Sequence, residues 1–177
     1  MDSLKSPSPL KGEGRGGGAN NGGGRCGVIV PEGVLFGSTG AHKELRRQLI
    51  ENNSVQAVLS LPGGVFQPYS GVKTSVLLFE KSGKTKRVLF LHADHDGYKL
   101  DAQHDTPIEQ DDLPALVATY KDHDACWKKW SKRKEGAEWT EKWWFATTEE
   151  LRANDYNLSA GRYRPLSQAQ VEHRDPR

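Results

Sequence analysis

Cysteine, methionine and long hydrophobic runs are scarce in this sequence of 177 residues. The two cysteines, Cys26 and Cys126, stand far apart and outside any paired motif. This excludes a disulfide framework and a cysteine-based zinc site, and it is typical of a reducing compartment. No apolar run approaches the roughly 18–20 residues that span a bilayer, and the N-terminus lacks the apolar core of a signal peptide. We therefore expect a soluble, cytoplasmic protein that does not associate with membranes.

The sequence also lacks a strong excess of charge of either sign. Lys and Arg number 25 against 23 Asp and Glu, which gives a net charge of +2. This balance neither predicts nor excludes a polyanionic partner, because local patches matter more than the sum. The first 24 residues are low in large apolar side chains and rich in glycine, and we predict that they are disordered. Their Gly12, Gly14 and Gly17 match a dinucleotide-binding pattern, but that pattern needs a strand before it and a helix after it.

Alternating strand and helix patterns begin at residue 25. Residues 26–31 form an apolar run that suits a central strand buried by helices on both faces. Further strands are predicted at 55–61, 73–80 and 87–92, and a helix at 41–52 that Ser38 or Thr39 caps. Ala41, Leu45 and Leu49, with Ile50 beside them, would form the apolar face of this helix, and Arg46 would lie on the polar face. The order predicts part of an α/β sheet whose final strands can run antiparallel.

The remainder of the chain reads as helical and polar. A helix is predicted from Asp111 to about Lys132, with Pro114 in its first turn. Thr147 and Glu150 form a capping box that opens a short helix ending near Asn154, and residues 166–177 are expected to be loose.

Isolated residues offer weak signals for chemistry. His92 and His95 lie among aspartates, but their spacing fits no helical or calcium-loop metal motif, so a surface turn is the favoured interpretation. Trp127 and Trp130 stand among lysines and suit either base stacking or packing against the body, and packing is the simpler interpretation. No nucleophile elbow or P-loop is present. We assign no catalytic, cofactor-binding or metal-binding residue.

Four segments taken together are specific: VIVPEGVLF, the basic helix that ends in Glu51-Asn52-Asn53, VLSLPGGVF and SGVKTSVLLFEK. In this order and spacing they resemble the C-terminal part of the catalytic domain of N6-adenine DNA methyltransferases, above all the methylation subunit of type I restriction–modification systems. The resemblance continues more weakly through RVLFLHAD and DDLPALVATYK to DYNLSAGRY.

The resemblance implies an α/β fold: residues 25–105 would be the C-terminal part of a Rossmann-like methyltransferase sheet, and residues 106–165 a helical extension. Intact members bind S-adenosylmethionine at the carboxyl ends of the first strands and flip the target adenine out of the duplex. The aromatic residue that would stack on the flipped base is Phe79, for which a place in the core is an equal alternative. Lys81 and Lys84 are candidate DNA contacts.

The sequence departs from the family in two motifs. The Asp/Glu/Asn-x-x-x-Gly-x-Gly cofactor loop and the Asn-Pro-Pro-aromatic loop should both precede VIVPEGVLF, and neither occurs. We therefore expect a fragment, from a truncated or frameshifted reading frame, that binds no S-adenosylmethionine and is inactive alone. Its expected partners are DNA, the specificity and restriction subunits, and a chain that supplies the missing half. The alternatives are a stand-alone module for DNA binding or subunit assembly, and a chain that does not fold stably because its sheet is open at 28–30.

Overall fold

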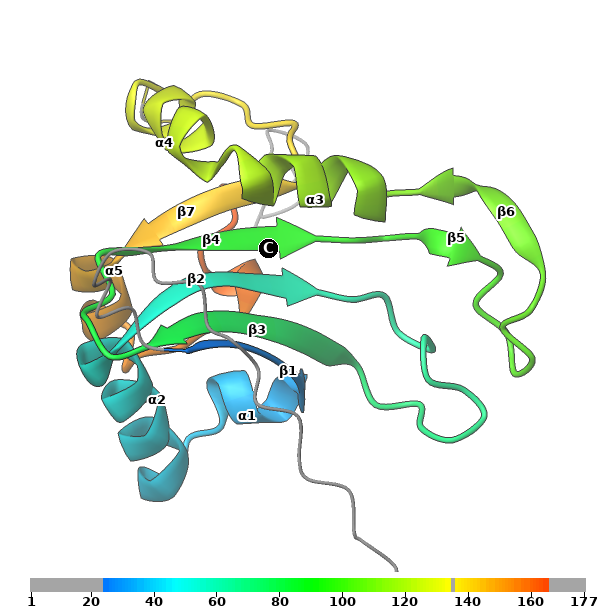
Figure 1. The fold of residues 1–177 in the computed structure, drawn as a ribbon, viewed down its shortest axis with the longest axis horizontal. Helices are drawn as coiled ribbons and strands as arrows, with labels where there is room; N and C mark the ends of the chain where they lie inside the picture. Colours follow the sequence, from blue (N-terminus) through cyan, green and yellow to red (C-terminus); the bar gives the residue numbers. More distant parts are fainter. Residues whose placement is uncertain (1–23, 135, 166–177) are drawn as a thin grey trace, which may run out of the picture.

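The computed structural model describes residues 24–134 and 136–165, which form one mixed α/β unit (Figure 1). The expectations for residues 1–23 and 166–177 concern residues outside this described part. The strands are β1 (Arg25–Pro31), β2 (Asn53–Ser60), β3 (Thr74–Lys81), β4 (Arg87–His92), β5 (Asp96–Tyr98), β6 (Pro107–Asp111) and β7 (Trp143–Thr147). The helices are α1 (Glu32–Phe36), α2 (Gly40–Asn52), α3 (Leu113–Lys121), α4 (His123–Ser131), α5 (Thr148–Ala153) and the 3-10 turn η1 (Ala160–Arg162).

Five strands form the main sheet in the order β1-β3-β2-β4-β7. The strands β2 and β4 are parallel, whereas β3 runs antiparallel to both β1 and β2, and β7 runs antiparallel to β4. The predicted mixed α/β sheet is therefore confirmed, and β2, β3 and β4 lie within a residue or two of their predicted positions. The strands β5 and β6 form a separate hairpin beyond the carboxyl end of β4 (Figure 1).

The prediction that residues 26–31 form a central buried strand is wrong. Within the described residues, β1 pairs only with β3 and forms one edge of the sheet. Six of its seven residues are exposed, including Val28 and Ile29 with 39% and 53% of their surface accessible. This apolar strand therefore lacks the helices on both faces that would bury a central strand.

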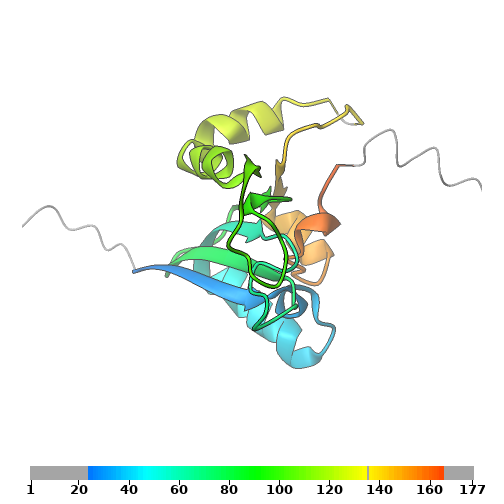
Figure 2. The same ribbon diagram turned by 90° about the vertical axis from the view of Figure 1, so that its right-hand side faces the viewer.

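The prediction of a wholly helical C-terminal part is also wrong. Trp143 to Thr147 form strand β7, and the predicted long helix is divided at Asp122 into α3 and α4. Trp143 packs edge to face with Trp139, and Phe145 with Trp127, so one face of β7 lies against the α4 region. Trp144 points to the other side, where its Nε1 donates a hydrogen bond to the carbonyl of Ala160 in η1 at 3.0 Å. Figure 2 shows α3 and α4 (yellow-green) above the sheet, α2 (cyan) below it, and α5 and η1 (orange) beside it. Trp130 is buried and Trp127 packs, partly buried, against the core, so both pack against the body as the simpler interpretation predicted.

Helix α2 buries only part of the predicted apolar face: Ile50 is buried and Leu49 packs against the core. Thr39 caps it as expected, accepting a hydrogen bond from the amide of His42. Leu45 is 57% exposed, whereas Ile50 and the charged Arg46 are buried. The Arg46 guanidinium donates to the carbonyl oxygens of Val34, Tyr156 and Asp155 at 3.0, 3.0 and 3.4 Å. Arg46 thereby joins α1, α2 and the segment 154–163, which also supplies the fully buried Leu158.

The predicted capping box is confirmed: the Thr147 hydroxyl accepts from the Glu150 amide and the Glu150 carboxylate accepts from the Thr147 amide. None of the described helices is long and apolar enough to cross a membrane.

Candidate nucleic-acid interface

Four positive charges gather where the chain turns from β3 into β4. Lys81 ends β3, Arg87 begins β4, and Lys84 and Lys86 lie between them. The backbone turns at Ser82 and Gly83, whose φ angles of 68° and 98° lie in the left-handed region that favours glycine. The predicted DNA contacts Lys81 and Lys84 therefore lie on one exposed turn, with two further cations after them.

Thr85 fixes this turn to the body of the protein. Its side chain is buried, and its Oγ1 accepts from the Val55 amide at 2.9 Å and donates to the Asn53 carbonyl at 2.8 Å. Its carbonyl accepts from the Thr148 hydroxyl at 2.5 Å, and its amide donates to the Ile50 carbonyl at 3.3 Å. The exposed Lys84 and Lys86 thus flank a residue with four hydrogen bonds, which limits the backbone entropy lost when they meet a ligand.

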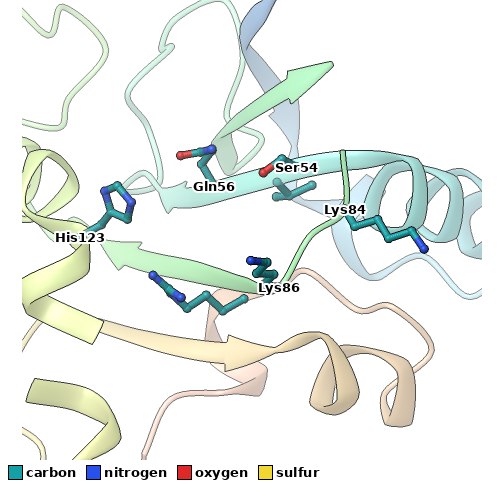
Figure 3. Close-up of a pocket in the computed structure, with 7 residues that line it drawn as sticks. Ser54, Gln56, Lys84, Lys86 and His123 are labelled. Atoms are coloured by element: carbon teal, nitrogen blue, oxygen red, sulfur yellow. The ribbon is translucent and has the colours of Figure 1, made fainter. Parts of the chain in front are cut away.

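A cavity of about 300 Å³ lies beside the turn (Figure 3). It is lined by residues at the start of β2, along the turn and at the start of α4: Ser54, Val55, Gln56, Lys84, Lys86, Arg87 and His123. His123 is the first residue of α4, and its Nδ1 lies 3.2 Å from the Tyr120 carbonyl. The N-terminal end of a helix carries a partial positive charge, so α4 adds to the positive potential here.

The cations of this cavity differ in what already neutralises them. Arg87 donates to the Asp124 carboxylate at 2.7 Å and lies 4.8 Å from the centre of the Trp127 ring. No carboxylate among the described residues lies within 4.0 Å of Lys84 or Lys86. The cavity therefore holds an excess of positive charge that its own residues do not balance.

Phe79 lies next to this region. It is partly buried, faces Cys26 and Val55 in the register of the sheet, and packs against the hydrophobic core. It also lines a second cavity of about 250 Å³, together with Arg25, Cys26, Gly27, Gln56, Leu78, Glu80 and Tyr120. Gln56 lines both cavities, so they adjoin. The fold thus brings the three predicted site residues to one end of the sheet.

That end is the amino-terminal end of the parallel strands β2 and β4. Ligands of doubly wound sheets bind at the opposite, carboxyl end. A stacking role for Phe79 therefore requires DNA to reach the amino-terminal end of the sheet.

Ion pairs occupy the carboxyl end of β4. His92 Nε2 lies 3.1 Å from Asp94, and Lys142 bonds both Asp94 and Asp112 at 2.9 and 2.7 Å. The ammonium of Lys142 is the main cause that lowers the pKa of Asp94, whereas burial lowers the pKa of His92. Within the described ranges, no three His, Cys, Asp or Glu side chains come together to hold a metal ion.

The segments at the carboxyl end of the parallel strands lack the family's cofactor motif. Chain segments 32–37, 61–66 and 93–95 follow β1, β2 and β4, and none contains the glycine-rich pattern that would cradle the cofactor. We therefore assign no cofactor-binding residue.

Lys86, Arg87 and His123 line the cavity of the candidate interface, and the sequence interpretation did not assign them. The cluster of cations in Lys84-Thr85-Lys86-Arg87 was a usable signal for the first two. His123 had none, because only the packing of α4 brings it to the turn.

Comparisons with known proteins agree with the fold. The model of the N-6 DNA Methylase family matches residues 19–173. The EcoEI methylase subunit of Escherichia coli is 42% identical over 77 residues, covering 43% of this chain and 16% of that protein. The EcoKI methylase subunit of Escherichia coli K12 is 30% identical over 155 residues, covering 82% of this chain and 28% of that protein. A structure concerning complex assembly of the type I R-M system superposes with a TM-score of 0.61 and 31% identity, over 87% of this chain and 32% of that one. The chain thus spans less than a third of each of these relatives.

Proposed function

Since this chain belongs to the N-6 DNA methylase family, we propose that it is the C-terminal part of a type I restriction–modification methylase subunit. In this role it contributes to S-adenosylmethionine-dependent methylation of adenine N6 in DNA. It completes a catalytic unit whose cofactor loop and Asn-Pro-Pro-aromatic loop come from another polypeptide segment. Alone, these 177 residues transfer no methyl group.

The open edge of the sheet at β1 is the observation that carries this proposal. Val28 and Ile29 expose apolar surface there, and the backbone on the outer side of β1 has no partner strand among the described residues. An edge of this kind is a template for pairing with a further strand. A segment that pairs with β1 extends the sheet beyond the strand order seen here and adds the missing loops.

The expected partners follow from the same proposal. This chain is similar to the EcoKI methylase subunit over 82% of its length, and this similarity supports assembly with specificity and restriction subunits. DNA is the substrate, with Lys81 and Lys84 contacting its phosphates. Phe79 is proposed to stack on a base. Phe79→Leu, which removes the aromatic ring, should then lower the affinity for DNA more than Leu78→Ala does. Leu78→Ala is the control, because it removes apolar surface from the same cavity but no ring.

A stand-alone DNA-binding module without catalysis is the second candidate, and the unbalanced charge of Lys84 and Lys86 favours it. It differs from the first candidate in two respects: it takes no part in methyl transfer, and it needs no complementary polypeptide.

The test is a methyl-transfer assay with radiolabelled S-adenosylmethionine and duplex DNA. The full chain is assayed alone, and then with a polypeptide that carries the two missing loops and with a specificity subunit. We expect no transfer alone and transfer from the mixture. Ile29→Lys should abolish the restored activity, because charge on an edge strand blocks strand pairing. Leu45→Lys, at an exposed site on α2, is the matched control and should not. Transfer by the chain alone, or saturable donor binding in calorimetry, would refute the proposal.

A further inference from the structure

The cavity beside the β3–β4 turn has the composition of an anion site. Apart from Val55, its lining side chains are cations or can donate a hydrogen bond, and it includes no Asp or Glu. Three acidic groups adjoin these residues: Arg87 already engages Asp124, Glu80 lines the adjoining cavity, and Asp122 directly precedes His123 at the start of α4. Lys84 and Lys86 are exposed, and no internal carboxylate has to be displaced from them before they contact a ligand.

We propose that this cavity holds a phosphate group of the DNA backbone. Lys86 supplies the charge within the cavity, Lys84 contacts the neighbouring phosphate outside it, and the Ser54 hydroxyl and the Gln56 amide supply hydrogen bonds. In Figure 3, Lys86 lies between Ser54 and His123 along the cavity, whereas the side chain of Lys84 leaves the turn with its ammonium pointing away from the other lining residues. The inference rests on the proposed function, in which DNA is the substrate. It adds Lys86 and the cavity to the contacts proposed there.

The arrangement favours a polymer of phosphates over a single small anion. Lys81, Lys84 and Lys86 follow one another along a single turn, and Arg25 lines the adjoining cavity. A row of cations on a rigid loop matches successive phosphates of a backbone and carries no sequence information.

The experiment measures binding of a 20-base-pair duplex to the full chain by fluorescence anisotropy at a series of salt concentrations. The double variant Lys84→Gln/Lys86→Gln is compared with Lys43→Gln/Lys99→Gln. The control pair removes the same charge from lysines that already bond Asp155 and Asp101, outside the cavity. If each cavity lysine contacts one phosphate, the slope of log affinity against log salt falls by about 1.8 in the cavity variant. Between 50 and 200 mM salt, that variant then loses roughly tenfold less affinity than the unmodified chain.

Two results would overturn the phosphate site. One is an equal change of slope in both double variants, since this reports net charge alone. The other is a duplex-induced change of amide resonances that spares Ser54, Lys86 and His123. Inorganic phosphate added alone at high concentration should shift the same resonances weakly. If it shifts them as strongly as the duplex does, the cavity is a site for free phosphate instead.

The outcome is separable from that of the proposed function. Methyl transfer by the chain alone would refute the proposed function and leave the salt slopes interpretable. Restored transfer from the mixture, with unchanged slopes in the cavity variant, would refute only the phosphate site. Because Lys84 and Lys86 are exposed, the urea midpoint of the cavity variant should equal that of the unmodified chain, which separates lost binding from lost folding.

Discussion

Arg46 is predicted to be the charged residue on which the fold depends most. Only 3% of its surface is accessible, and its guanidinium donates to three backbone carbonyls from two distant segments. Two of these carbonyls belong to Asp155 and Tyr156, whose φ angles are both 54°. Non-glycine residues adopt this conformation at a cost, and surrounding contacts must hold them there.

Replacing Arg46 with Met keeps the apolar stem and removes all three hydrogen bonds. A bond from a charged donor contributes about 1.5–3 kcal/mol, and a buried carbonyl left without a partner costs about 1–3 kcal/mol. The contributions are not additive, and Met recovers part of the loss because the desolvation of a buried charge disappears. The same desolvation lowers the pKa of Arg46. We therefore expect a net loss of about 3 kcal/mol in the free energy of unfolding.

The assay is urea unfolding followed by circular dichroism. With a slope of about 2 kcal/mol per molar, a loss of that size lowers the midpoint by about 1.5 M. The urea midpoint of Arg46→Lys should lie between those of Arg46→Met and the unmodified chain. The compact ammonium of lysine cannot contact three separated carbonyls as the planar guanidinium does. Arg47→Met is the matched control. Arg47 pairs with Glu44 on the exposed side of the same helix, so its replacement should leave the urea midpoint almost unchanged. Equal midpoints for Arg46→Met and Arg47→Met would refute the reasoning.

Two further predictions concern the turn and the pH dependence of stability. Thr85→Val should cost about 2–3 kcal/mol in urea unfolding, because it leaves a buried amide and a buried carbonyl unpaired, whereas Thr85→Ser should cost clearly less. Equal costs for the two would contradict this account of the turn. The hydrogen bond from Arg152 lowers the pKa of Glu51 from 4.5 to about 2, with Tyr156 also donating to its carboxylate. A lowered pKa means that the folded state binds this proton less readily, so the stabilisation is complete above about pH 4.5 and is lost as the pH falls towards 2. Glu51→Gln should flatten the stability profile in that window, and an unchanged profile would exclude this pair as its source.

The sequence interpretation succeeded where local pattern and tertiary environment agree. Strands β2, β3 and β4 lie in the interior of the sheet, and such strands are runs of β-branched and leucine residues that can be recognised without a partner. The capping box at Thr147 is similarly local. Each of these signals is contained within a few residues.

The errors arose where distant segments decide the environment. The apolar spacing of α2 did not predict that Arg46 would be buried, because two of its three carbonyl partners lie more than 100 residues away. Strand β7 was missed because Trp143, Trp144 and Phe145 follow a stretch rich in charge and are buried only by α4 on one side and η1 on the other. At the candidate interface, the cations could be recognised in the sequence, but the cavity could not, because it forms only once α4 packs beside the turn.

The two edge strands of the sheet differ in burial, and this difference indicates the edge at which a further strand would assemble. Strand β7 is buried, and the indole of Trp139 donates a hydrogen bond to the carbonyl of Trp143. Strand β1 has no such cover in the described part of the chain, and its one charged residue, Arg25, stands at its beginning. Proteins usually protect exposed edges with charges, bulges or covering segments, because a bare apolar edge pairs with other chains. The protected edge is therefore the outer boundary of the fold, and β1 is the edge at which a further strand would join the sheet. A partner that restores activity while leaving Val28 and Ile29 as accessible as before would contradict this assignment.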